Sequence, residues 1–432
     1  MKTSNTKKVG LAALALLILA PLAVIAVQML HEPGSDQRAA PVTDAQAQLA
    51  RGRYLAQAGN CMGCHTVRGG APFAGGRAIS TPFGNVYATN ITPDPATGLG
   101  KWSADDFWRA MHNGKGKDGS FLYPVFPYPN YTKVTRADSD AIYAYLRSVP
   151  AVKQAAREHE LRFPYNQRFM LAFWRTLYFD AGEYQPVAKQ NAEWNRGAYL
   201  VQGLGHCSAC HTTRNALGGT ASGAELAGGM IPMQNWYAAS LTADAETGLG
   251  DWSTEELTDL LHTGVSNRGA AYGPMAEVVA SSLQHLSEPD VRSMAVYLKT
   301  APSTVASHGS PAVQIAVDRK PVLEEGARLY TKYCVECHKA DGKGVPRVFP
   351  PLAGNRSLSV QTPVNTIRVV LNGGFAPTTK GNPQPYGMPP FGITLDDTEV
   401  AAVVSYIRTS WGNNGSLVSP VEVGRHRSAP TD

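Results

Sequence analysis

The sequence has few cysteines: only six among 432 residues, and none lies outside a motif. All six belong to three Cys-x-x-Cys-His pentapeptides, which are Cys61–His65, Cys207–His211 and Cys334–His338. A structural zinc site needs a second pair of ligands near the first, and no further cysteine exists to provide one. A thioredoxin-like redox motif would account for one copy but not for three. The scarcity of cysteine therefore favours covalent haem attachment at all three motifs.

The pentapeptide suits a porphyrin because its two thiols add across the two vinyl groups of one ring. The two-residue spacing lets one helical turn reach both vinyls, and the adjacent histidine places an imidazole nitrogen on the iron. The sequence thus predicts three covalently bound haem c groups. The attachment residues are Cys61, Cys64, Cys207, Cys210, Cys334 and Cys337, and the predicted iron ligands are His65, His211 and His338.

Charged residues are also scarce, at 17% of the chain, and the net charge is only +5. No long basic run is present, so nothing indicates nucleic-acid binding. The chain is instead rich in glycine (42) and proline (30), which fits small, loop-rich domains whose cores contain a large prosthetic group. The predicted fold class is mainly α. Glycine pairs such as Gly69-Gly70 lack the strand-to-helix context of a nucleotide site, so we expect no catalytic site in the chain.

One long apolar run is present, from Val9 to Leu30, and three lysines precede it. It is long enough to cross a bilayer, which takes about 20 residues, and the lysines orient the remainder outward. A retained transmembrane helix and a signal peptide cleaved after Ala26 are both open, and the length favours the anchor. Either reading places the haem motifs on the periplasmic side of the cell membrane, where covalent haem attachment takes place.

The pentapeptides lie in repeated modules. A short helix is predicted before each motif and another at the end of each module. The first two modules share Thr-Gly-Leu-Gly-x-Trp-Ser, starting at Thr97 and Thr247, and each copy leads into a helix capped by its serine. The predicted organisation is an N-terminal anchor or signal with a linker (1–45), haem domain one (46–150), an aromatic and basic segment (151–190), haem domain two (191–301), a linker (302–320), haem domain three (321–412) and a loosely ordered tail (413–432).

Two readings of the aromatic and basic segment stay open: a helix that packs domains one and two together, or a docking face for a partner protein or the membrane surface.

The sixth ligand differs among the three sites. Met388, in Gly-Met-Pro-Pro, and Met275, after Gly-Pro, are the predicted ligands of haems three and two, because a thioether opposite histidine favours ferrous iron. At the corresponding place domain one has Phe126, which cannot coordinate iron. Its sixth ligand is left unassigned, and His112 is predicted to be structural, since His262 occupies the same place beside Met275. Pro351 is the predicted acceptor for the far ring nitrogen of His338.

The chain resembles the three-haem cytochrome c subunits of periplasmic membrane-bound dehydrogenases. The resemblance covers about residues 46–412. It rests on the three motifs, on the segments 81–87 (TPFGNVY) and 89–94 (TNITPD), and on Leu122-Tyr123-Pro124 with 127–132 (PYPNYT). Many relatives of the alcohol dehydrogenase branch have methionine in place of Phe126.

The resemblance implies an electron-transfer subunit that passes electrons from a catalytic subunit, either a molybdenum hydroxylase or a flavoprotein, through three haems to ubiquinone or a terminal oxidase. The alternatives are a haem enzyme or gas sensor that uses an open first haem, and a cytochrome subunit of a terminal oxidase. The substrate of the complex does not follow from the sequence.

Overall fold

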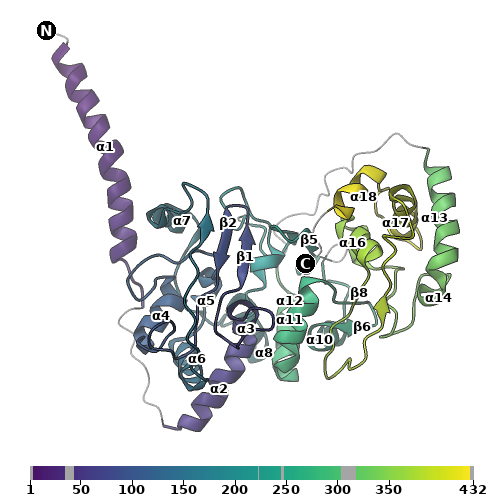
Figure 1. Ribbon diagram of the computed structural model, residues 1–432, viewed down its shortest axis with the longest axis horizontal. Helices are drawn as coiled ribbons and strands as arrows, with labels where there is room; N and C mark the ends of the chain where they lie inside the picture. Colours follow the sequence, from purple (N-terminus) through teal and green to yellow (C-terminus); the bar gives the residue numbers. More distant parts are fainter. Residues whose placement is uncertain (1–2, 35–42, 222, 245–247, 303–317, 429–432) are drawn as a thin grey trace. The chain divides into compact units, whose positions relative to one another are not determined.

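The computed structural model describes residues 3–34, 43–221, 223–244, 248–302 and 318–428 (Figure 1). They form two compact units. Unit one holds the described residues up to 56, residues 64–185 and residues 216–219, and unit two holds residues 57–63 and the described remainder from 186 onward. Thr247 of the repeated sequence and residues 303–317 of the predicted linker lie outside the described residues.

Both units are mainly helical. The elements from the N-terminal helix to the end of the aromatic segment are α1 (Thr3–Leu30), α2 (Ala45–Ala58), α3 (Cys61–His65), β1 (Ala78–Thr81), β2 (Gly84–Tyr87), α4 (Ala104–Asn113), α5 (Tyr128–Tyr131), α6 (Arg136–Ser148), β3 (Glu160–Leu161), the 3₁₀ turn η1 (Arg168–Met170) and α7 (Leu171–Tyr178). All belong to unit one except the last two residues of α2 and the first three of α3. The strands form an antiparallel sheet in the order β1-β2-β3. Within α1, residues Leu11–Leu30 are apolar and long enough to cross a membrane, a property that a signal sequence would share.

Unit two contains the second and third modules, each with its own Cys-x-x-Cys-His sequence. The first has α8 (Ala192–Gln202), α9 (Ser208–His211), β4 (Gly229–Ile231), β5 (Trp236–Ala238), α10 (Thr254–Thr263), β6 (Val265–Ser266), β7 (Gly269–Ala270), α11 (Pro274–Ser281), η2 (Leu283–His285) and α12 (Glu288–Leu298). The second has α13 (Arg319–Tyr333), α14 (Val335–His338), α15 (Arg356–Ser359), α16 (Val364–Asn372), β8 (Gly374–Phe375), β9 (Gly387–Met388), α17 (Asp397–Thr409) and α18 (Pro420–Arg427).

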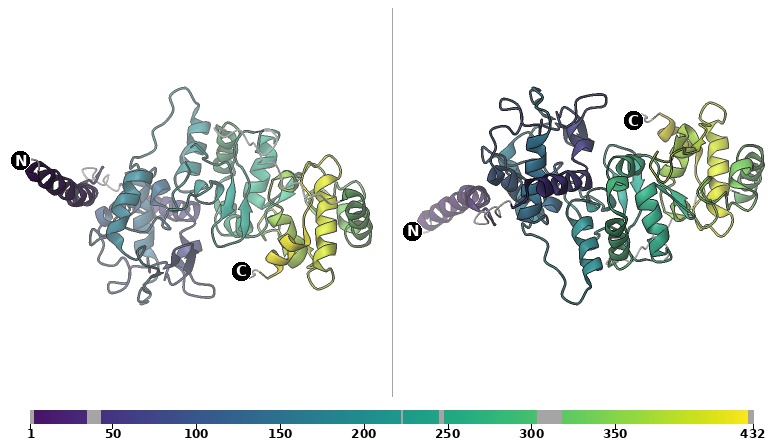
Figure 2. Two further views of the ribbon diagram at one scale, coloured as in Figure 1. Left: turned by 90° about the horizontal axis from the view of Figure 1, so that it is seen from above. Right: turned by 90° about the horizontal axis from the view of Figure 1, so that it is seen from below.

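In every module the first helix crosses the last helix at a glycine. A Cβ atom at Gly52, Gly197 or Gly326 would lie 1.9, 1.8 or 2.3 Å from a backbone carbonyl oxygen of the closing helix. Only glycine permits this approach of two backbones. The pairs α8–α12 and α13–α17 pack along their length, and the latter pair is visible in both views of Figure 2. The repeated glycine therefore sets the crossing of the two helices that frame each haem motif.

The helices predicted after the shared Trp-Ser sequence are present. Ser103 and Ser253 accept a hydrogen bond from the third residue of α4 and α10, and the acidic side chains there bond back, which completes a capping box in each case. Gly114 and Gly264 end these helices with φ values of 60° and 82°. The local sequence signals at both ends of these helices are thus confirmed.

The tail beyond residue 412 was expected to be loose, and that expectation is wrong for residues 413–428, the part of the tail that the structure describes. Helix α18 packs against α16 and α17, with Val418 and Val423 buried in the core of the third module. Arg427 of α18 donates to Asp397 Oδ1 at 2.7 Å and to the carbonyl oxygen of Leu395 at 2.9 Å. The sequence of the tail is polar, and two buried valines with these bonds suffice to hold it on the module.

Within the aromatic segment between modules one and two (151–190), the two-residue strand β3 joins the β1–β2 sheet, and the helix α7 follows it. Leu171 and Ala172 of α7 are buried together with Phe121 of module one, and Ile25 of α1 packs on the same cluster. The predicted packing helix is therefore present in unit one. Its joining of two modules stays a prediction.

Candidate haem sites

Each pentapeptide forms a single helical turn that follows a longer helix. The turns are α3, α9 and α14, and each ends at its histidine. None of the six cysteines, all within the described residues, forms a disulfide; five of them are half-buried, while Cys210 is exposed. A turn of this kind places the first cysteine, the second cysteine and the histidine on one short stretch of backbone, which is what attachment to one porphyrin requires.

The three histidines are oriented in the same way. The Nδ1 atom of His65 lies 2.7 Å from the carbonyl oxygen of Thr89, that of His211 lies 2.7 Å from Ala239, and that of His338 lies 3.0 Å from Pro350. A carbonyl oxygen can only accept, so Nδ1 must donate the proton in each case. The Nε2 atom of each ring then carries the lone pair that an iron ion would take.

The acceptor predicted for His338 was Pro351, and this is wrong by one residue: the carbonyl of Pro350 accepts the bond. No acceptor was predicted for His65 or His211. Thr89 and Ala239 hold the same place in the repeated segments 88–94 (ATNITPD) and 238–244 (AASLTAD). The repeat therefore links the two acceptors to each other, but no side chain marks either of them.

Burial keeps these imidazoles neutral in the protein without haem. Desolvation lowers the pKa of His211 to about 4, and the bond to Ala239 opposes this shift only in part. Desolvation also lowers the pKa of His65 and of His338, against the bonds to Thr89 and Pro350. A neutral imidazole is the form that binds a metal, so the sites favour the ligating state of the ring.

Met388 is held in place by backbone contacts. It lies in β9 opposite Gly374 of β8, and its side chain packs on the core cluster that Cys334 and Val335 also contact. A Cβ at Gly373 would lie 2.3 Å from the Met388 carbonyl oxygen, so this residue must be glycine. Met388 and Cys334 thus border the same core. The role of Met388 as an iron ligand stays a prediction.

Met275 is the second residue of α11 and is half-buried. The preceding Gly273 has φ of 56° and rests on the indole of Trp236, where a Cβ would come within 2.7 Å of the ring. This tight turn fixes where α11 begins and therefore fixes the backbone position of Met275.

The loop of module one differs at Phe126, whose ring packs edge-on against Tyr131 with 5.3 Å between centroids. His112 is buried and stacks on Trp108 at 4.3 Å, with its Nδ1 atom 3.4 Å from the Thr132 hydroxyl. This packing supports the structural role predicted for His112. The sixth ligand of the first haem stays unassigned.

The residues present fit covalent haem. Each site offers two cysteines on one turn that form no disulfide and an imidazole whose Nδ1 atom is already bonded. Within the described ranges, no three His, Cys, Asp or Glu side chains gather as an ion site of the kind that zinc occupies. The cysteines would hold the porphyrin covalently, and the haem would supply one-electron redox chemistry.

Comparison with known proteins identifies the class as c-type cytochromes, because the Cytochrome c family model matches residues 49–150 and 323–411. The gluconate 2-dehydrogenase cytochrome c subunit of Pantoea cypripedii is 41% identical over 85% of this chain and 86% of its own length. The cytochrome c subunit of a quinone alcohol dehydrogenase from Gluconacetobacter polyoxogenes is 37% identical over 87% of this chain and 83% of its own length.

A third relative is named as one of the subunits of nicotinate dehydrogenase and comes from Pseudomonas putida. It is 44% identical over 84% of this chain, which spans only 30% of that longer protein. The chain belongs to the family of dehydrogenase cytochrome c subunits. It is an electron-transfer subunit that carries covalent haem c, and the alternatives of a haem enzyme, a gas sensor and a terminal oxidase subunit are not favoured.

Proposed function

We propose that the chain carries three haem c groups and passes electrons from a catalytic dehydrogenase subunit to ubiquinone or a terminal oxidase at the periplasmic face of the cell membrane. The observation that carries this proposal is the threefold recurrence of one arrangement. In each copy a Cys-x-x-Cys-His turn is followed by a histidine–carbonyl bond. The proposed ligands are His65, His211 and His338, with Met275 and Met388 as the sixth ligands of haems two and three.

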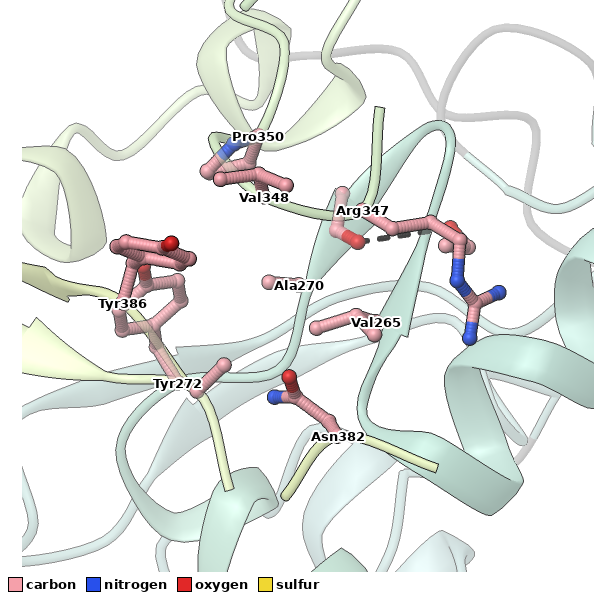
Figure 3. Close-up of a pocket in the computed structure, with 11 residues that line it drawn as sticks. Val265, Ala270, Tyr272, Arg347, Val348, Pro350, Asn382 and Tyr386 are labelled. Atoms are coloured by element: carbon pink, nitrogen blue, oxygen red, sulfur yellow. Dashed lines mark hydrogen bonds between the residues drawn. The ribbon is translucent and has the colours of Figure 1, made fainter. Parts of the chain in front are cut away.

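The contacts between the second and third modules support electron transfer between their haems. One small hollow lies between the two modules (Figure 3). It is lined by β6 and β7 of module two and by residues from 347–350 and 382–386 of module three. Pro350, whose carbonyl holds His338, lies on the wall of this hollow. The proximal side of the third site therefore borders the second module directly.

The catalytic partner is proposed to be a molybdenum hydroxylase, with a flavoprotein as the alternative. The relative named for nicotinate dehydrogenase favours the first, and the relatives named as gluconate and alcohol dehydrogenase subunits leave the second open. The place of Phe126 in the first module is the feature by which this chain departs from many alcohol dehydrogenase subunits.

The N-terminal helix is proposed to remain as an anchor. Lys115 is fully buried. Its ammonium group donates to the carbonyl oxygens of Met29 and His31 at 2.8 and 3.1 Å. The same group pairs with the carboxylate of Glu32 at 3.2 Å. A cation there complements the C-terminal end of the α1 dipole. Trp108 and Asn113 donate to the next carbonyls along the chain, those of Gly34 and Pro33. Side chains of module one thus bind the backbone carbonyls at the end of α1 and in the residues that follow it.

Purification of the native complex from membranes tests the function. We expect a catalytic dehydrogenase subunit to copurify, three haems per chain by haem quantification and intact mass, and reduction of all three by the substrate of the partner. A chain that carries fewer than three haems, or that oxidises a substrate by itself, would contradict the proposal. Carbon monoxide added to the reduced complex reports separately whether the first iron is open.

A further inference from the structure

Helix α7 is fixed to the end of the membrane helix. The Gln28 side chain of α1 donates to the Thr176 hydroxyl at 3.2 Å and accepts from Arg175 Nε at 3.1 Å. One turn earlier, Ile25 packs on the cluster that contains Leu171 and Ala172. Arg175 is buried and also donates to the carbonyl of Asn113, so α7 joins α1 to the body of module one.

The opposite face of α7 is apolar and partly exposed. Phe173 and Leu177 lie four residues apart and so share this side of the helix; Phe173 is half-buried. Phe169 precedes α7 in the turn η1. Phe169 is 50% exposed and Leu177 is 65% exposed, and Met170 at the start of the same segment is 40% exposed. Full burial of a phenylalanine or leucine side chain is worth about 1.5–3 kcal/mol, which is a strong reason for such a face to have a partner.

The depth of this face follows from its contacts with α1. The apolar span of α1 ends at Leu30. With a rise of 1.5 Å per residue, Ile25 and Gln28 lie about 7.5 and about 3 Å inside that end. Ile25 thus falls within the depth at which interfacial helices rest, roughly 5–10 Å into the boundary between headgroups and acyl chains, and Gln28 lies nearer the surface.

Polar groups beside the face suit a lipid surface. Arg162 and Arg168 are exposed and lie close in sequence to Phe163 and Tyr165, of which Phe163 is 79% exposed. Each arginine also donates to a backbone carbonyl, Arg162 to that of Pro82 and Arg168 to that of Phe121. Exposed arginines attract anionic headgroups, and aromatic residues are enriched at membrane interfaces. The segment therefore combines an apolar face, aromatic rings and cations in the arrangement of an interfacial anchor.

We propose that residues 163–177 form a second membrane contact, in which the exposed face of α7 inserts into the outer leaflet of the cytoplasmic membrane beside α1. This rests on the retained anchor described above. The contact would hold module one against the bilayer surface and restrict its rotation about α1, since a single helix alone leaves that rotation free.

Spin labelling of the full, haem-loaded chain in vesicles of phosphatidylethanolamine and phosphatidylglycerol tests the proposal. Because all six native cysteines hold haem, a new cysteine is the only thiol available for a nitroxide. The test variant is Leu177→Cys. The matched control is Leu49→Cys, an exposed leucine of α2 in the same unit, on the side away from α1 (Figure 1). Collision rates with oxygen and with a water-soluble nickel chelate report whether each label lies in lipid.

We expect the ratio of oxygen to nickel collisions to be several-fold higher at position 177 than at position 49. Equal ratios would overturn the proposal. Protection of position 177 that arises only when the catalytic subunit is added would overturn it as well, and would assign the face to a protein partner. Intact mass distinguishes failure of the proposed anchor from failure of the lipid contact. Loss of the first 26 residues refutes the anchor, whereas an intact chain with a water-exposed label refutes only the lipid contact.

Discussion

At the residue scale, each candidate haem histidine is held by a backbone carbonyl, and the three bonds differ by only 0.3 Å in length. The histidine side therefore gives the three proposed haems little reason to differ. The residues proposed for the opposite side do differ: Met275 is the second residue of a helix, Met388 lies in a short strand, and Phe126 has no lone pair to donate. The residue opposite the histidine is where the three redox potentials are expected to diverge.

Replacement of each methionine tests this assignment. We expect Met388→Ala and Met275→Ala each to lower one haem potential, because a thioether stabilises ferrous iron, and to leave the other two nearly unchanged. The shift should be a sizeable part of the roughly 0.8 V that axial ligands span. Spectroelectrochemical titration of the purified complex measures it. The control is Met233→Ala, an exposed methionine of module two that should alter no potential. If both test variants titrate like the parent, the ligand assignment is wrong.

The buried His112 is expected to make the stability of module one sensitive to acid. Burial lowers its pKa in the folded protein to about 4, from an ordinary value of 6.5. Between these values the unfolded chain binds a proton that the folded module excludes, so the free energy of unfolding falls as pH decreases from 6.5 to 4. A shift of this size corresponds to a loss of about 3 kcal/mol.

His112→Phe keeps a flat ring on Trp108 and removes the proton site. Denaturant unfolding of the variant and the parent at several pH values should show a shallower acid loss for the variant. If the free energy of unfolding falls equally with pH in the two proteins, His112 is not the cause of the acid sensitivity.

At the element scale, α18 supports the loop that follows Met388. Arg427 donates to the carbonyls of Gly392 and Leu395 and to Asp397 at the start of α17. Loss of these bonds leaves buried or half-buried carbonyls without a donor, at about 1–3 kcal/mol. We expect Arg427→Ala to weaken the methionine-to-iron charge-transfer band of the third haem and to lower its potential.

Arg425→Ala is the matched control, since Arg425 lies exposed on the same helix. An unchanged charge-transfer band in Arg427→Ala, or an equal loss in both variants, would show that α18 does not position the Met388 loop.

The elements that could be predicted from the sequence are those with local signals. The serine caps of α4 and α10 and their glycine ends are local, and both were found. The carbonyls of Thr89 and Ala239 carry no side-chain signal, because any residue has a carbonyl and only the loop path aims it. Helix α18 has a polar sequence whose two buried valines gain a partner only once the third module has folded. What the sequence could not supply is therefore tertiary in origin.

At the scale of the whole molecule, modules two and three form one unit because several polar groups cross between them. Asn365 of α16 exchanges two hydrogen bonds with the backbone of Tyr237, at 2.9 and 2.8 Å. Arg356 of α15 donates to the carbonyls of Ser240 and Gly248 at 2.7 and 2.6 Å. Burial lowers the pKa of Arg356 to about 10, so the guanidinium keeps its charge at neutral pH. Ser240 directly follows Ala239, the residue that holds His211.

Arg356 is therefore expected to contribute to both the stability of unit two and the potential of the second haem. Arg356→Met should reduce the free energy of unfolding of unit two by about 1–3 kcal/mol, because two carbonyls lose a charged donor. It should also lower the potential of the haem at His211, since a nearby positive charge favours the ferrous state. Arg347→Met is the control. It breaks the Arg347–Asp259 pair between the same modules, but the two side chains are 39% and 49% exposed, so the pair is worth at most about 1 kcal/mol.

Calorimetry of the haem-loaded protein in detergent measures the loss of stability, as a fall of about 2–4 °C in the melting temperature of unit two for each kcal/mol. Redox titration measures the shift in potential. Equal behaviour of the two variants would mean that Arg356 is an ordinary surface contact, and a large stability loss with an unchanged potential would confine its role to holding the two modules together.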